Sequence, residues 1–259
     1  MSRDARWKAL LELLVERGRL DVEEAAADLE VSAATIRRDF DLLAEQQMLV
    51  RTRGGAVPHG VSYELPLRYK TARHASEKQR VAEAVAGLIA PGEAVGLTGG
   101  ATTTEVARAL AVRGDLASGS PALTVVTNAL NIANELAVRP QFKIVVTGGV
   151  ARAQSYELVG PLADAVLGRI TLDVTVLGVV AFDAVHGPAA NDEAEAAINQ
   201  LLCERAERVV VAADSSKLGR RAFARICGVE SVDTLVTDAA AGSDAVRPFE
   251  EAGVRVITA

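Results

Sequence analysis

The stretch VSAATIRRDFDLLAEQQMLVRTRGGAV, residues 31–57, has the pattern of a helix followed by a small hairpin. Ser32 is a favoured N-cap residue, and a helical pattern of apolar residues continues from there to Glu45. A short extended run follows, and the pair Gly54 and Gly55 interrupts it in a way that suits a tight hairpin turn. The stretch therefore predicts a helix and a wing.

Two more helices are predicted before this stretch. ARWKALLELLVERG carries leucines at helical spacing and ends at Gly18, which suits a left-handed C-cap. DVEEAAADLE follows, with Asp21 as its expected N-cap. Helix, helix, turn, helix and hairpin is the order of a winged helix-turn-helix domain.

The third helix presents two arginines on its outer face. Winding it at 100° per residue places Ile36, Phe40 and Leu43 on one stripe, with Arg37 and Arg38 roughly opposite. An outward arginine at the start of such a helix can grip guanine or phosphate in bidentate fashion. A merely solvated charged face is the alternative, because exposed charges are common. The residues expected to contact DNA are Ser32, Thr35, Arg37, Arg38, Arg51, Arg53, Gly54 and Gly55.

The remainder of the chain alternates apolar, β-branched runs with helical segments. This pattern predicts an α/β domain with a mainly parallel sheet flanked by helices. We expect a winged helix-turn-helix domain over residues 1–57, a basic linker over residues 58–74 and an α/β domain over residues 75–259. Residues 46–80 hold seven Lys or Arg against two Asp or Glu, which makes this part locally basic.

Composition limits the remaining classes of function. The 259 residues carry a formal net charge of -6, and no apolar run approaches the ~18 residues of a membrane helix. We expect a cytoplasmic protein without a membrane partner. Cys203 and Cys227, with three histidines, show no metal-ligand spacing, so we expect buried free thiols, no metal and no cofactor.

The stretch GLTGGATTTEVARAL predicts a strand, a glycine-rich loop and a helix. The free N–H groups at such a helix start form an anion site, and threonine hydroxyls add donors. The loop matches neither the P-loop nor the dinucleotide-binding pattern. A plain turn capped by threonines is the alternative.

Further candidates follow other strands. Asp214 and Lys217 come directly after the buried run RVVVAA, so they are expected at its carboxyl end, where open α/β sheets bind ligands. A lysine in a surface turn is the alternative. Asn128 in VTNA, and Gly148 with Gly149 in VTGG, follow two more strands.

TIRRDFDLLAEQQMLVRTRGGAV resembles the N-terminal signature of DeoR-type bacterial transcription regulators. LVGPLADAVL, DVTVLGVVAFDAVHG and VVVAADSSKLGRRAFARI resemble that family's effector domain, in order and spacing. The resemblance implies a second domain similar in fold to ribose-5-phosphate isomerase and coenzyme A transferases, controlled by a phosphorylated sugar or related metabolite. It further implies a repressor of sugar-metabolism genes that binds double-stranded operator DNA and self-associates as a dimer or tetramer.

The resemblance also implies that residues 99–104 cradle the effector's phosphate and that Lys217 approaches it. The expected effector-binding residues are Gly99, Gly100, Ala101, Thr102, Thr103, Thr104, Asn128, Gly148, Gly149, Asp214 and Lys217.

Two positions depart from the family pattern. Thr98 stands where an acid commonly opens the loop, and Ala197 with Ile198 stand where basic residues are frequent. We therefore expect an atypical or less polar effector.

A sugar-phosphate isomerase-like enzyme with an appended nucleic-acid-binding domain is the alternative function. Isomerisation needs a carboxylate base at the ligand carbon, and the sequence offers no clear replacement for the acid absent at Thr98. A pure scaffold would not need glycines and threonines clustered at strand ends.

Overall fold

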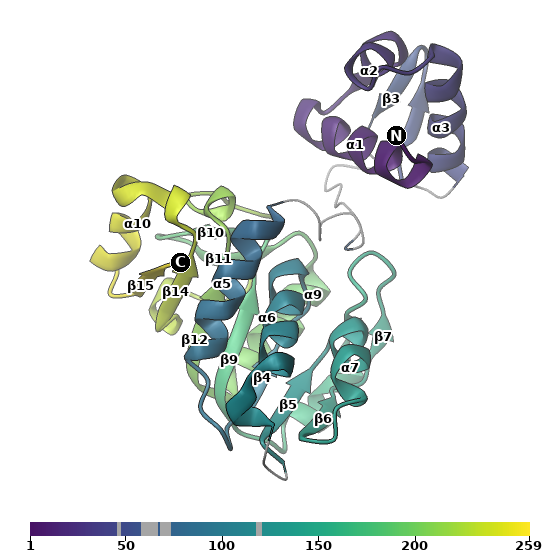
Figure 1. Ribbon diagram of the computed structural model, residues 1–259. Coiled ribbons are helices and arrows are strands. Elements are labelled where there is room, and N and C mark those ends of the chain that lie inside the picture. The colour runs from purple at the N-terminus through teal and green to yellow at the C-terminus, as the bar shows by residue number, and fades with distance from the viewer. Residues whose placement is uncertain (46–47, 58–66, 68–73, 118–120) are drawn as a thin grey trace. The chain divides into compact units, whose positions relative to one another are not determined.

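The computed structural model describes residues 1–45, 48–57, 67, 74–117 and 121–259 (Figure 1). The chain divides into two compact units, Met1–Tyr69 and Lys70–Ala259. Apart from positions 67 and 74, the expected linker at residues 58–74 lies outside the described residues.

The N-terminal unit has the winged helix-turn-helix order. Its elements are α1 (Arg3–Arg17), β1 (Leu20–Asp21), α2 (Val22–Asp28), α3 (Ala33–Glu45), β2 (Val50–Thr52) and β3 (Gly55–Val57). The strands form an antiparallel sheet in the order β1-β3-β2. The two-residue strand β1 was not predicted, because it is too short to show a period.

Each predicted helix cap is confirmed. Gly18 has φ 68° and donates its N–H to the carbonyl oxygen of Leu14. The carboxylate of Asp21 accepts the N–H of Glu23. The N–H of Thr35 donates to Oγ of Ser32 at 3.2 Å. These caps satisfy backbone groups that helix termini leave unpaired.

A buried polar cluster joins α1 to α3. Asp39 is only 3% exposed, and its carboxylate accepts Nε of Arg6 at 2.5 Å and Nε1 of Trp7 at 2.8 Å. The hydrogen bond to Asp39 raises the pKa of Arg6. Around this cluster the stripe predicted on α3 is buried against residues of α1 and α2.

The C-terminal unit is built on a seven-stranded parallel sheet with the order β15-β14-β12-β9-β4-β5-β6. Its strands are β4 (Ala94–Leu97), β5 (Leu123–Thr127), β6 (Phe142–Val146), β9 (Leu172–Gly178), β12 (Ala206–Ala212), β14 (Thr234–Thr237) and β15 (Arg255–Thr258). The expected α/β class with a parallel sheet is confirmed.

Helices cover both faces of this sheet. They are α5 (Ala75–Gly87), α6 (Ala101–Val112), α7 (Leu130–Ala137), α8 (Asp164–Leu167), α9 (Glu193–Glu204) and α10 (Gly242–Glu251). Residues of α5, α6 and α7 pack with Val95, Val125 and Val174. Residues of α9 and α10 pack with Val209, Val211 and Leu235, from the opposite face (Figure 1). Burial on both faces explains the continuous apolar runs of the strands.

Two small sheets lie beside the large one. One is the hairpin of β7 (Val150–Ala151) and β8 (Leu158–Val159). The other joins β10 (Ala181–Asp183), β11 (Gly187–Ala190) and β13 (Ala224–Arg225). The sequence pattern predicted neither sheet.

The strand order of the large sheet reverses between β4 and β9. From β4 the chain continues to β5 and β6, and from β9 it continues to β12, β14 and β15 on the other side. Loops that leave neighbouring strands in opposite directions open a crevice at their carboxyl ends, where such sheets bind ligands. The glycine-rich loop of residues 98–100 follows β4 and so lies at this point.

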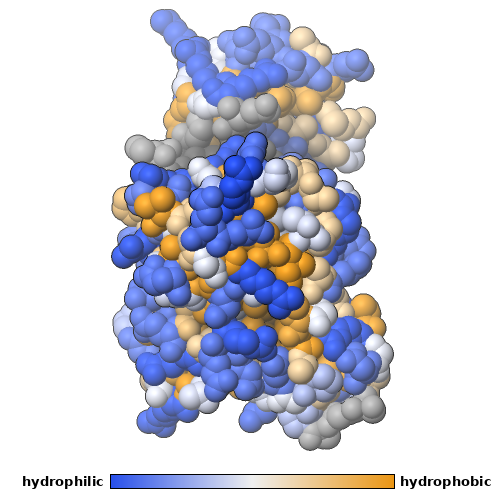
Figure 2. All heavy atoms as spheres, turned by 90° about the vertical axis from the view of Figure 1, so that its left-hand side faces the viewer, coloured by the Kyte–Doolittle hydropathy of each residue, from blue (hydrophilic) through white to orange (hydrophobic). Residues whose placement is uncertain are grey.

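Figure 2 shows a different side of the molecule, the side of α10 and β15, where apolar side chains gather between polar ones.

Candidate functional site

The outer face of α3 carries the arginines that the sequence singled out. Arg37 and Arg38 are exposed, as are Ala34 and Asp41 on the same face. Nη2 of Arg37 lies 2.9 Å from Oε1 of Glu23 on α2. Both side chains of this pair are mostly in solvent, so the ion pair contributes little and costs little to break.

Arg38 is not tied to the protein in this way. Among the residues that the structure describes, none forms a hydrogen bond or ion pair with its guanidinium. At the start of the same helix, Ser32 and Thr35 hydrogen-bond to each other through their hydroxyls at 2.8 Å, which adds to the cap. The face therefore offers small residues and an available planar cation.

The wing holds its two arginines differently. Nε of Arg51 lies 2.8 Å from Oδ1 of Asp41, and its Nη1 donates to the carbonyl oxygen of Gly55 at 2.9 Å. Its guanidinium also lies 5.5 Å from the ring centroid of Phe40. Arg51 therefore braces the wing against α3. Arg53 is exposed at the turn, without a partner in the described parts of the chain.

The two wing glycines also differ. Gly54 is exposed and has φ 92°, as the tight turn requires. Gly55 is buried, and a Cβ there would lie 2.3 Å from the carbonyl oxygen of Leu20. Its small size serves the close approach of β1 to β3, and the expectation of a close phosphate contact rests mainly on Gly54.

In the C-terminal unit, α6 begins at Ala101, directly after the glycine-rich loop. Gly100 is its N-cap with φ 137°, and no side chain caps the first turn. The hydroxyls of Thr103 and Thr104 donate to the carbonyl oxygen of Gly100, at 3.1 and 2.6 Å. The first backbone N–H groups of α6 have no intrahelical partner, which is the geometry that the predicted anion site requires.

Thr98 connects the two strands at the point of reversal. Its Oγ1 accepts the backbone N–H of Gly178, at the end of β9, at 2.9 Å. A Cβ on Gly178 would lie 2.8 Å from the carbonyl oxygen of Gly99. The loop after β4 is thus packed directly against the end of β9. Ala101 and Thr102 are buried beside it.

The remaining predicted residues lie at other strand ends. Asn128 follows β5 and is fully buried. Gly148 and Gly149 follow β6 with positive φ, and a Cβ on Gly149 would meet the backbone of β8. Both glycines therefore serve the entry into the β7–β8 hairpin.

Asp214 and Lys217 follow β12, two strands from β4. The carboxylate of Asp214 accepts the N–H of Ser216 and caps the short turn Ser215–Lys217. This local bond accounts for the burial of Asp214.

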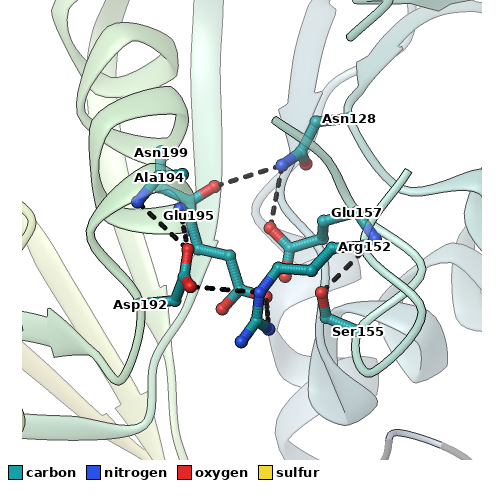
Figure 3. A network of polar contacts seen from close by, with 8 residues as sticks. All are labelled: Asn128, Arg152, Ser155, Glu157, Asp192, Ala194, Glu195 and Asn199. Atoms are coloured by element: carbon teal, nitrogen blue, oxygen red, sulfur yellow. Dashed lines mark hydrogen bonds and ion pairs between the residues drawn. The ribbon is translucent and has the colours of Figure 1, made fainter. Parts of the chain in front are cut away.

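The structure adds five residues that sequence reasoning missed (Figure 3). Nδ2 of Asn128 donates to Oε2 of Glu157 at 2.8 Å and faces Oδ1 of Asn199 at 3.5 Å. Arg152 follows β7, and its side chain reaches the start of α9, where its Nη1 donates to Oε1 of Glu195 at 2.7 Å. Nε of Arg152 also lies 3.1 Å from Oδ2 of Asp192, the N-cap of α9.

For two of these residues, the sequence contains a pattern that could have identified them. Glu195 and Asn199 are four residues apart, and so share the buried face of α9. Glu157 and Arg152 lie on the β7–β8 hairpin, and their position depends on long-range pairing that no local pattern reveals.

Three expected absences concern the described residues only. Within them, no helix is long and apolar enough to cross a membrane, and no group of three or more metal-ligating side chains occurs. Cys203 and Cys227 are free thiols. Cys203 is buried, but Cys227 is half-buried, so the expectation of burial was wrong for the second cysteine.

Comparison with protein families covers most of the chain. Residues 6–59 match the DeoR-like helix-turn-helix domain, and residues 73–239 match the DeoR C terminal sensor domain. A putative aga operon transcriptional repressor of Escherichia coli O157:H7 is 33% identical over 97% of this chain and 92% of its own length. The glycerol-3-phosphate regulon repressor of Escherichia coli K12 is 31% identical over 92% of each chain.

Solved structures give weaker likenesses. The sorbitol operon regulator SorC from Klebsiella pneumoniae is 14% identical, with TM-score 0.43 over 96% of this chain and 100% of its own. Ribose 5-phosphate isomerase A from Methanocaldococcus jannaschii is 15% identical, with TM-score 0.42 over 56% and 54%. These structural likenesses are too weak to support an assignment. The two family matches and the sequence relatives all indicate the same family. The chain belongs to the DeoR family of helix-turn-helix transcription regulators.

Proposed function

We propose that this regulator is a repressor of sugar-metabolism genes that releases its operator when a phosphorylated sugar or polyol binds the C-terminal unit. The relatives named above as repressors support the sign and the class of genes. The observation that carries DNA reading is the exposed guanidinium of Arg38 on α3, without a partner among the described residues.

Arg38 is the proposed base reader, and Arg37 and Arg53 are proposed phosphate contacts. A bidentate arginine contact to a base contributes about 1–3 kcal/mol of discrimination. Arg38→Ala is therefore expected to weaken binding to an operator selected from random duplex DNA by about tenfold to a hundredfold, with less effect on unrelated DNA.

The measurement is fluorescence anisotropy of the labelled operator at fixed salt. Arg247→Ala is the matched control, because it removes an equal charge from an exposed position on α10. If the Arg38→Ala protein bound the operator as tightly as the parent, this would show that the outer face of α3 does not contact DNA.

The proposed phosphate site is the first turn of α6. Backbone N–H groups without a capping side chain, together with the helix dipole, favour an anion there. Lys217 is proposed to approach the same phosphate from the end of β12.

We also propose self-association, since one short recognition helix covers few base pairs and dimers read paired half-sites. Sedimentation with and without DNA tests it.

A sugar-phosphate isomerase activity remains the second candidate, and one observation favours it. The buried carboxylate of Glu157 lies against Gly99, at the carboxyl edge where a catalytic base would be needed. We expect no turnover of pentose or hexose phosphates by the pure protein. Isomerisation that disappears in a Glu157→Gln variant would establish the enzyme instead.

A further inference from the structure

Cys203 and Cys227 are the two cysteines of the chain, and the fold brings them together. Cys203 lies in the last turn of α9, and Cys227 follows β13 by two residues. The thiol of Cys203 donates a hydrogen bond to the thiol of Cys227, so the two sulfur atoms are in direct contact. Neither the DNA-binding face nor the proposed effector site uses this pair.

Regular structure holds both thiols in place. Cys203 is 6% exposed and belongs to the core packed around α9. Next to Cys227, the N–H of Ile226 donates to the carbonyl oxygen of Pro188 at 2.8 Å. A Cβ on Gly187 would lie 2.2 Å from the carbonyl oxygen of Cys227, so this segment packs directly on β11. The contact between the thiols is therefore built into the fold.

A cavity of about 290 Å³ gives access to the pair. Both cysteines line it, and so do the exposed side chains of Gln200 and Arg225, so the cavity opens to solvent. Its volume is many times the ~30 Å³ that a water molecule occupies in the liquid, so a molecule as small as hydrogen peroxide fits. Cys227 is half-buried and Cys203 is buried, so such a molecule reaches Cys227 first.

The two thiols differ in their readiness to ionise. The hydrogen bond from Cys203 lowers the pKa of Cys227. Burial and the charge of Glu230 oppose this shift, and Arg225 adds to it. The pKa of Cys203 is raised by the same hydrogen bond and by burial. The thiolate is the form that reacts with peroxides, so Cys227 is suited to attack and Cys203 to close the bond afterwards.

We propose that Cys203 and Cys227 form a peroxide-sensitive pair that closes to a disulfide within the chain. The thiolate of Cys227 attacks one oxygen of hydrogen peroxide. The S–O bond forms, the O–O bond breaks, and the departing hydroxide takes up the proton that Cys227 released. Sγ of Cys203 then attacks Sγ of Cys227. The S–S bond forms, the S–O bond breaks, and the proton of Cys203 leaves with that oxygen as water. In sum, two thiols lose two electrons and two protons, and the peroxide becomes two water molecules.

Peroxide treatment of the full chain tests the pair. A small molar excess of hydrogen peroxide is followed by alkylation with N-ethylmaleimide and by peptide mass spectrometry. We expect both thiols to disappear together, with one product in which the peptides of Cys203 and Cys227 are joined with the loss of two hydrogen atoms. Dithiothreitol should restore both thiols. In Cys203→Ala the disulfide cannot close, so Cys227 should carry a sulfenic acid that dimedone traps.

Cys227→Ala is the matched variant, because it leaves only the buried thiol. Cys203 should then be oxidised at least about tenfold more slowly than Cys227 is in the parent. Equal rates would overturn the assignment of Cys227 as the attacking thiol. A parent in which Cys227 becomes a sulfinic acid while Cys203 can still be alkylated overturns the proposal, and so do disulfides that form only between molecules. Should Cys203→Ala not fold, Cys203→Ser provides the same comparison.

Discussion

At the scale of single residues, the contact between Gly99 and Glu157 places a buried carboxylate against the loop that opens α6. The absence of a side chain at Gly99 is what leaves room for the buried carboxylate. From the sequence, the missing acid at Thr98 suggested a less polar effector. That expectation took no account of Glu157, which brings a carboxylate to the same loop from another part of the chain.

A double-mutant cycle tests this contact. Gly99→Ala should lower the free energy of unfolding by about 1–3 kcal/mol, because its Cβ overlaps Cγ and Cδ of Glu157. In a Glu157→Ala background, which removes those atoms, the same substitution should cost less than half as much. Chemical denaturation of the four proteins measures the coupling. Equal costs in both backgrounds would show that the two residues do not touch.

The two cysteines differ in their titration. Cys203 and Cys227 line a cavity of about 290 Å³. A hydrogen bond from Cys203 lowers the pKa of Cys227, while the pKa of Cys203 is raised well above its usual value by that bond and by burial. The thiolate is the reactive form, so Cys227 should react first as pH rises.

Alkylation with iodoacetamide at pH 8, followed by peptide mass spectrometry, measures this order. We expect Cys227 to be modified at least tenfold faster than Cys203 in the folded protein, and about equally in denaturant. Cys227→Ser should leave Cys203 slow. Faster modification of Cys203 would reverse the assignment.

At the scale of elements, local patterns predicted the helices and the parallel strands. Caps and stripes specify α1, α2 and α3, and long apolar runs specify strands such as β9 and β12, because each depends on residues close in sequence. The β7–β8 hairpin was missed because its strands have two residues each and pair with the segment before α7. Half of the polar network around Asn128 depends on that hairpin.

The connection between α1 and α3 gives a prediction of its own. Asp39→Ala should lower the stability of the N-terminal unit by about 1–3 kcal/mol, because it removes the acceptor of the half-buried Arg6 and of the buried Nε1 of Trp7. Trp7 is the single tryptophan of the chain, so its fluorescence reports on this unit during denaturation. Asp41→Ala is the control on the same helix. It breaks an exposed pair with Arg51 and should cost less than about 1 kcal/mol. Similar losses in both proteins would contradict the account.

At the scale of the whole molecule, the proposed regulation couples the two units through linkage. A ligand that prefers one state of the protein shifts the population toward that state only by its differential affinity. An effector bound at the carboxyl edge of the sheet must therefore bind the released state more tightly than the DNA-bound state. Weaker effector binding then moves the response to higher effector concentration, without changing operator affinity in its absence.

The most direct test is operator binding titrated with the sugar or polyol phosphate that controls the parent, compared with Lys217→Met. A charge-assisted hydrogen bond to phosphate contributes about 1.5–3 kcal/mol, so the variant's dose curve should shift to higher effector concentration by roughly tenfold to a hundredfold. Operator affinity without ligand should be unchanged. Lys143→Met, at an exposed position on the edge strand β6, should respond like the parent. Coincident curves for the parent and Lys217→Met, or loss of DNA binding without ligand, would contradict the account.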